Sequence, residues 1–145
     1  MIRKLLIAIA VLTAGLAVTG VGLGAGSATK KLTAKLNNAQ EVPKPDADGG
    51  SGRFTATLTG RTLRWKLTFK GLTGSASAAH IHFGKRGVAG AVGLPLCGPC
   101  TSGAHGKARV TLTLARTLKK GNAYVNVHTQ KNADGEIRGQ IHLAS

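Results

Sequence analysis

Three histidines stand on two short alternating stretches and have the spacing of metal ligands. His80 and His82 flank Ile81, and His128 follows Val127 further along the chain. Alternate residues of a β-strand point to opposite faces, so His80 and His82 share one face, about 7 Å apart along the backbone. Imidazole nitrogens suit copper and zinc. The sequence predicts a metal site at His80, His82 and His128, with copper as the first candidate. The alternative is that these rings hydrogen-bond to loop backbone and bind no metal.

The other histidines and one arginine are placed by similar reasoning. His105, in a glycine-rich segment, is predicted as a fourth metal ligand. His142 is expected at the surface, about 13 Å along the sheet from His128 at the usual strand rise. Arg138 is expected beside His128, where its charge would oppose a metal or attract an anion, so we predict an anion-binding role for it. The predicted hairpin register pairs His128 with Arg138, Asn126 with Gln140 and Tyr124 with His142.

The two cysteines, Cys97 and Cys100, have the spacing of a thioredoxin redox motif, with Gly98 and Pro99 between them. That motif requires a helix start in a βαβ context, and this loop offers neither. Two nearby cysteines in an exported chain more often form a disulfide. We therefore predict a local structural disulfide, with a redox or copper-thiolate role as the alternative.

Catalytic groups are sparse. The chain has only five carboxylates, and none is paired in a way that suggests acid–base chemistry: Glu41, Asp46, Asp48, Asp134 and Glu136. Its serines in glycine-rich loops have neither a nucleophile elbow nor an evident triad. The sequence favours a protein that is not an enzyme, without deciding the question.

The N-terminus has the pattern of a signal peptide. Arg3 and Lys4 precede an apolar run that extends to about Gly26, and small residues follow. We expect residues 1–28 to be a cleaved signal peptide and residues 29–145 to form one domain, secreted or held in the cell envelope. No transmembrane segment would then remain. The alternative is an uncleaved membrane anchor.

Charge restricts the expected partners. The 145 residues carry a formal net charge of +15, which favours polyanions such as anionic cell-envelope polymers. The chain shows no nucleic-acid motif, so sequence-specific nucleic-acid binding is not expected. Because the basic residues are scattered along the sequence, a solvated basic surface without a specific partner is the alternative.

The elements that position these residues are short strands. Apolar and polar residues alternate in seven stretches between turn formers, which predicts an all-β sandwich or barrel: residues 32–36, 54–58, 63–69, 79–83, 110–114, 123–129 and 136–143. Residues 84–107 are expected to form a long loop with room for one short strand. A basic loop or a single turn is expected at 115–121.

Four stretches, in order, resemble the CHRD domain, the module named after chordin: residues 36–43, 79–84, 124–129 and 135–141. The resemblance implies a secreted all-β, Greek-key sandwich of immunoglobulin-like or superoxide-dismutase-like type. In chordin such modules belong to a protein that sequesters extracellular growth factors. We therefore expect a non-enzymatic extracellular binding module, for which an extracellular protein is a second kind of partner.

A weaker resemblance is to copper,zinc superoxide dismutase. The order of His80 and His82, then His105, His128 and Arg138 is similar to that of the metal-site residues in that family. The loop here has one histidine and no aspartate, so a zinc subsite is absent. The cysteines also lie only three positions apart. This resemblance implies a copper-only site and supplies the competing hypothesis, a copper-dependent redox protein.

Overall fold

The computed structural model describes residues 27–145; most of the predicted signal peptide lies outside this part of the chain. The described residues form eight strands joined in one antiparallel sheet of order β5-β4-β7-β8-β1-β2-β3-β6, which confirms the all-β fold. The strands are β1 (Lys30–Asn37), β2 (Ser51–Thr59), β3 (Thr62–Lys70), β4 (Ala76–Phe83), β5 (Val92–Cys97), β6 (His105–Arg109), β7 (Ala123–Thr129) and β8 (Ile137–Leu143). A short 3-10 turn, η1 (Asn38–Gln40), follows β1.

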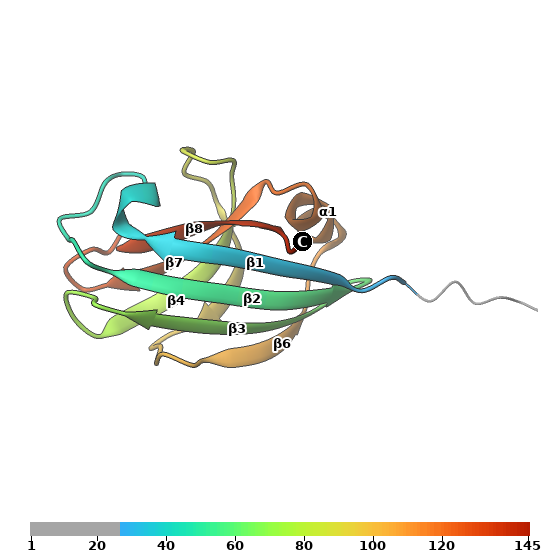
Figure 1. Ribbon diagram of the computed structural model, residues 1–145, viewed down its shortest axis with the longest axis horizontal. Coiled ribbons are helices and arrows are strands. Elements are labelled where there is room, and N and C mark those ends of the chain that lie inside the picture. The colour runs from blue at the N-terminus through green and yellow to red at the C-terminus, as the bar shows by residue number, and fades with distance from the viewer. Residues whose placement is uncertain (1–26) are drawn as a thin grey trace, which may run out of the picture.

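The sheet folds over on itself into two layers (Figure 1). Strands β1, β2, β3 and β6 make one layer, and β5, β4, β7 and β8 make the other. The layers are continuous through the β1–β8 pair, where Leu32 lies opposite Leu143 and Asn37 lies opposite Arg138. The chain crosses between layers after β3, β5 and β6, and these crossings give the predicted Greek-key sandwich.

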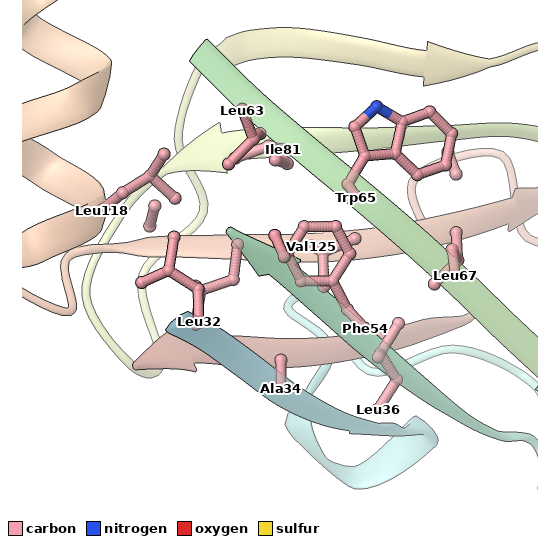
Figure 2. Packing of buried hydrophobic residues seen from close by; sticks show 14 of the residues in the cluster. Leu32, Ala34, Leu36, Phe54, Leu63, Trp65, Leu67, Ile81, Leu118 and Val125 are labelled. Carbon is pink, nitrogen blue, oxygen red and sulfur yellow. The ribbon is translucent and has the colours of Figure 1, made fainter. Parts of the chain in front are cut away.

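The core fills the space between the two layers. Leu32, Phe54 and Leu63 from one layer meet Ile81 and Val125 from the other, each at most 1% exposed. Figure 2 shows these side chains directed towards one another across the sandwich. Each such side chain contributes about 1.5–3 kcal/mol by leaving water. The apolar alternation of the strands therefore determines which of their faces points inward.

One expected strand is a helix instead. Residues 110–114 were predicted to be extended, but α1 spans Leu112–Lys119. Thr111 caps its start by accepting a hydrogen bond from the Leu114 backbone nitrogen, 3.1 Å away. Leu114 and Leu118 are four residues apart and both fully buried, which is the spacing of one helix face. Among the described residues, no helix is long and apolar enough to cross a bilayer.

The expected long loop contains more structure than predicted. Both β5 and the beginning of β6 lie within residues 84–107. Strand β5 pairs with β4 through irregular registers, so its alternation is broken in the sequence. Between the two strands, Cys97 and Cys100 form a disulfide with a Cα–Cα distance of 5.3 Å, as predicted. The Cys100 backbone nitrogen also donates to the Ala76 carbonyl at 3.0 Å, and this bond holds the loop against β4.

A candidate metal centre

Neighbouring strands bring three histidines together. Strand β4 pairs with β7 so that His80 lies opposite Asn126 and Ala78 lies opposite His128. The apolar residues of both strands face the core, which leaves the histidines on the other face of the sheet. One ring nitrogen from each of His80, His82 and His128 lies within 4.8 Å of the others. The structure thus brings together the three residues that the sequence singled out.

This face is not the open surface that alternation alone suggests. His82 and His128 are each only 8% exposed, and all seven residues of β7 are buried. The connections at 84–91 and 130–136 lie over the strands and hydrogen-bond to their side chains. We call this side of β4, β7 and β8 the covered face. The sequence predicts its side-chain directions correctly but misses its burial.

Backbone carbonyls determine which ring nitrogens are free. His82 Nδ1 lies 2.8 Å from the Gly90 carbonyl oxygen, and His128 Nδ1 lies 2.9 Å from that of Ala133. A carbonyl only accepts hydrogen bonds, so each Nδ1 carries the proton and each Nε2 presents a lone pair. His82 Nε2 is buried without a hydrogen-bond partner. The backbone contacts expected as the alternative to a metal site are present, and they leave Nε2 of both rings available as a ligand.

The third ring completes the cluster. His80 Nδ1 lies 3.0 Å from His128 Nε2; since His128 Nε2 accepts, His80 Nδ1 donates in the metal-free state. Burial lowers the pKa of His80, and the neighbouring His128 and His82 lower it further. Burial also lowers the pKa of His128, against the opposing effect of its bond to Ala133. Both rings are therefore held in the neutral form that a metal ion requires.

The last hairpin is shifted by two residues from the predicted register. Asn126 lies opposite Arg138 and Tyr124 lies opposite Gln140, so Arg138 is not opposite His128. A two-residue shift preserves the face of every side chain, which is why the face assignments are still correct. The shift arises because residues 130–136 make a wider loop than a tight turn, closed by the Glu136 backbone nitrogen donating to Val127 O at 2.8 Å.

Arg138 has a structural task in this position. It is 1% exposed, and its Nη2 donates to the carbonyls of Lys85 and Val88 at 2.9 and 3.0 Å. These bonds fix the 84–91 connection over the sheet. Its Nη1 is buried without a partner, and the predicted role of Arg138 in binding an anion stays a prediction.

An aromatic ring links Arg138 to the histidines. The Tyr124 ring stacks on His82 with centroids 4.9 Å apart and planes 11° from parallel. The Arg138 guanidinium carbon lies 3.4 Å from the centroid of the Tyr124 ring. The Tyr124 hydroxyl accepts from the Gly90 nitrogen at 3.2 Å. Tyr124 therefore fixes both the plane of the His82 ring and the loop that supplies its carbonyl partner.

Two carboxylates support this site, and no local pattern in the sequence marks either of them for that role. Glu41 is buried, which raises its pKa, while the Val42 backbone bond and the Arg138 charge oppose the rise. A Cβ on Gly135 would clash with Glu41 Oε2, and Gly135 also has a φ of +132°. Only glycine allows the loop to approach Glu41 this closely.

Glu136 holds the other loop. It accepts hydrogen bonds from the Thr73 backbone and hydroxyl and from the Thr129 hydroxyl, all at 2.6 Å, and from Asn132 Nδ2 at 3.0 Å. Burial alone would raise its pKa, but these bonds outweigh burial and lower it. Glu136 thereby shapes the segment that carries the Ala133 carbonyl.

The two remaining histidines lie elsewhere. His105 is on β6, opposite Lys66 of β3, is exposed, and its Nδ1 contacts the Gly103 carbonyl at 3.2 Å. It does not join the cluster, because the strand that carries it pairs with β3 in the other layer. His142 is exposed on β8, as expected.

The fold and the site define an all-β Greek-key module with three histidines under two loops. The CHRD domain family matches residues 32–141, and the chain belongs to that family. Membership makes it a small binding module of the extracellular type. Neither the curated proteins nor the solved structures include a match to this sequence.

Proposed function

We propose that the protein is an extracytoplasmic, non-enzymatic binding module that holds a transition-metal ion on His80, His82 and His128. The observation that carries the proposal is the convergence of three ring nitrogens within 4.8 Å. A buried, unpartnered His82 Nε2 costs free energy unless something binds it. A metal ion would satisfy His82 and His128 without disturbing their bonds to Gly90 and Ala133.

Copper is the first candidate. The three ligands are all imidazoles, and the cluster includes neither a thiolate nor a carboxylate. Divalent copper heads the affinity order of the first-row metals at such nitrogen sites. The backbone carbonyls that bind the two Nδ1 protons are the usual outer partners of metal-bound histidines. Zinc is the main competitor, since it accepts the same ligands.

Export is supported by two features. The Cys97–Cys100 disulfide is typical of an oxidising compartment. The basic and apolar N-terminal sequence has the order of a secretion signal. The intact mass of protein recovered outside the cytoplasm tests this part: a mature N-terminus near Thr29 is expected, and a mass that retains residues 1–28 would contradict cleavage.

Titration of untagged protein with Cu²⁺ and Zn²⁺ tests the metal site. One equivalent of copper should bind the wild type. His82→Ala or His128→Ala should weaken binding by more than about 100-fold, since mutating even a hydrogen-bond partner of a metal ligand lowers metal affinity by about 10–100-fold. His142→Ala and His105→Ala are the matched controls and should leave affinity unchanged. No stoichiometric copper binding by the wild type, or an equal loss in the controls, would refute the site.

A second function is favoured by the exposure of one ligand. His80 is only partly buried, so a small molecule can approach a metal held there. A copper-dependent redox protein similar to superoxide dismutase is therefore the competing proposal. The redox function would be established if copper-loaded wild type consumes superoxide and His82→Ala does not. If the wild type binds copper but does not consume superoxide, the binding-module function is retained.

A further inference from the structure

Basic side chains gather on the outer face of the other layer. Alternate residues of β1, β2, β3 and β6 point away from the core, and their charged members are all lysine or arginine. We call this surface the cationic face: Lys31, Lys35, Arg53, Arg64, Lys66, Lys70, Lys107 and Arg109, all exposed. In the sequence these residues look scattered, and only the strand registers bring them side by side.

The registers set the cations in rows across the strands. Arg64 lies between Thr57 and Lys107, so the row runs across three strands. Arg53 lies opposite Lys35 in the same way. Threonines occupy most of the remaining outward positions on these strands, and their hydroxyls are further hydrogen-bond donors.

No acidic side chain lies among these cations. The five acidic residues of the chain lie outside β1, β2, β3 and β6, at 41–48 and 134–136. Glu41 and Glu136 are buried. Within residues 27–145, the one ion pair joins Lys131 to Asp46, away from the cationic face. The face therefore presents an uncompensated positive field.

The middle of the cationic face is hollowed. A groove of about 490 Å³ lies across β1, β2 and β3, with Lys31, Arg53, Arg64 and Lys66 among its lining residues. The large side chains Phe54 and Trp65 of these strands point to the core. The groove thus offers charged and hydroxyl groups, and the one ring among its lining residues, Trp65, is only 8% exposed and gives a base or a sugar little to stack on.

We propose that the cationic face binds a linear polymer whose backbone carries phosphate groups. Arginine forks match phosphate oxygens in pairs, and lysine binds phosphate as a point charge. A polymer recognised through its backbone needs no stacking rings, and His105 is the one exposed ring on these four strands. Rows of cations on neighbouring strands contact successive charges along such a chain.

Binding of long-chain inorganic polyphosphate to the full chain tests the proposal. The variant Arg53→Gln/Arg64→Gln/Lys66→Gln removes three charges from the groove. The matched control, Arg116→Gln/Lys119→Gln/Lys120→Gln, removes the same charge from exposed positions in and just after α1. The groove variant should lose more than about 10-fold in affinity and the control less than about 3-fold. The salt dependence of binding should also become shallower in the groove variant, because fewer counterions are released.

Three outcomes would overturn the proposal. Equal losses in the two variants, with both folded by circular dichroism, would mean that net charge alone attracts the polymer. Tighter binding to polyglutamate than to polyphosphate would assign the face to carboxylate polymers. Tighter binding to vesicles of phosphatidylglycerol would assign it to a lipid surface.

Discussion

The two outer faces of this sandwich arise from the same alternating pattern and end in opposite environments. On the covered face, His82, Tyr124 and His128 are buried and hydrogen-bonded to or packed against loops. On the cationic face, Arg53, Arg64 and Lys66 are exposed. The difference teaches that a strand pattern fixes the direction of a side chain, whereas the connections decide whether it meets water.

The connections of the two layers explain the contrast. Strands β2 and β3 are joined by a two-residue turn at Gly60 and Arg61, which is too short to cover either strand. The covered face lies beneath the segments 84–91 and 130–136, which direct backbone carbonyls at its side chains. The path of the connections, which fold over one face and leave the other bare, therefore separates the buried face from the exposed one.

The largest effect on stability is expected at the carboxylate that holds one covering loop. Glu136→Ala removes the acceptor for Thr73, Thr129 and Asn132, and bonds to a charged group are worth about 1.5–3 kcal/mol each before relaxation. We expect a loss of at least about 3 kcal/mol in the free energy of unfolding, measured by urea denaturation. Glu136→Gln retains one acceptor oxygen and should lose less. A loss below about 1 kcal/mol for Glu136→Ala would show that the loop does not depend on this residue.

A smaller effect is expected from acid. The pKa values of His80 and His128 are lowered in the folded protein and return to about 6.5 on unfolding. Below pH 6.5 the unfolded chain thus binds protons that the folded chain does not, so the free energy of unfolding should fall as the pH drops from 7 towards the folded values.

Metal-free protein, kept with a chelator, is the sample for this measurement. His80→Gln/His128→Gln should flatten the pH dependence between about 7 and 5, and His142→Gln should not. An unchanged slope in the double variant would mean that the covered face does not hold these rings neutral.

The smallest effect is expected on the cationic face. Arg53→Gln/Arg64→Gln/Lys66→Gln should change the free energy of unfolding by no more than about 0.5 kcal/mol per site, because exposed side chains without partners contribute little. Removal of like charges offsets part of that change. Thermal melts of the two triple variants provide the measurement. A melting temperature lowered by several degrees in the groove variant alone would show that these cations also stabilise the fold.

Local pattern predicted most of the strands because their apolar residues alternate without interruption. Leu63, Trp65 and Leu67 are an example, and all three are buried. The same rule failed at Leu112 and Leu114, where two-residue spacing coincides with the beginning of a helix. Only the Thr111 cap and the four-residue interval from Leu114 to Leu118 distinguish the helix from a strand.

The histidines of the candidate site were predictable from the sequence, but their surroundings were not. Spacing on the strands selected His80, His82 and His128, since strand parity is a local property. Glu41 is affected by the charge of Arg138, and Glu136 is hydrogen-bonded to Thr73; both partners are distant in sequence. His105 was misplaced for the same reason, because nothing local to it indicates that its strand pairs with β3.

Because the two faces lie on opposite sides of the molecule, binding through one face determines where the other face points. The cationic face and the histidine cluster lie on the outer sides of opposite layers, with the core between them. A chain attached to an anionic surface through Arg53, Arg64 and Lys66 would thus present His80 to the surrounding fluid. Attachment would orient every copy alike, so that a layer of this protein would display its histidines outward.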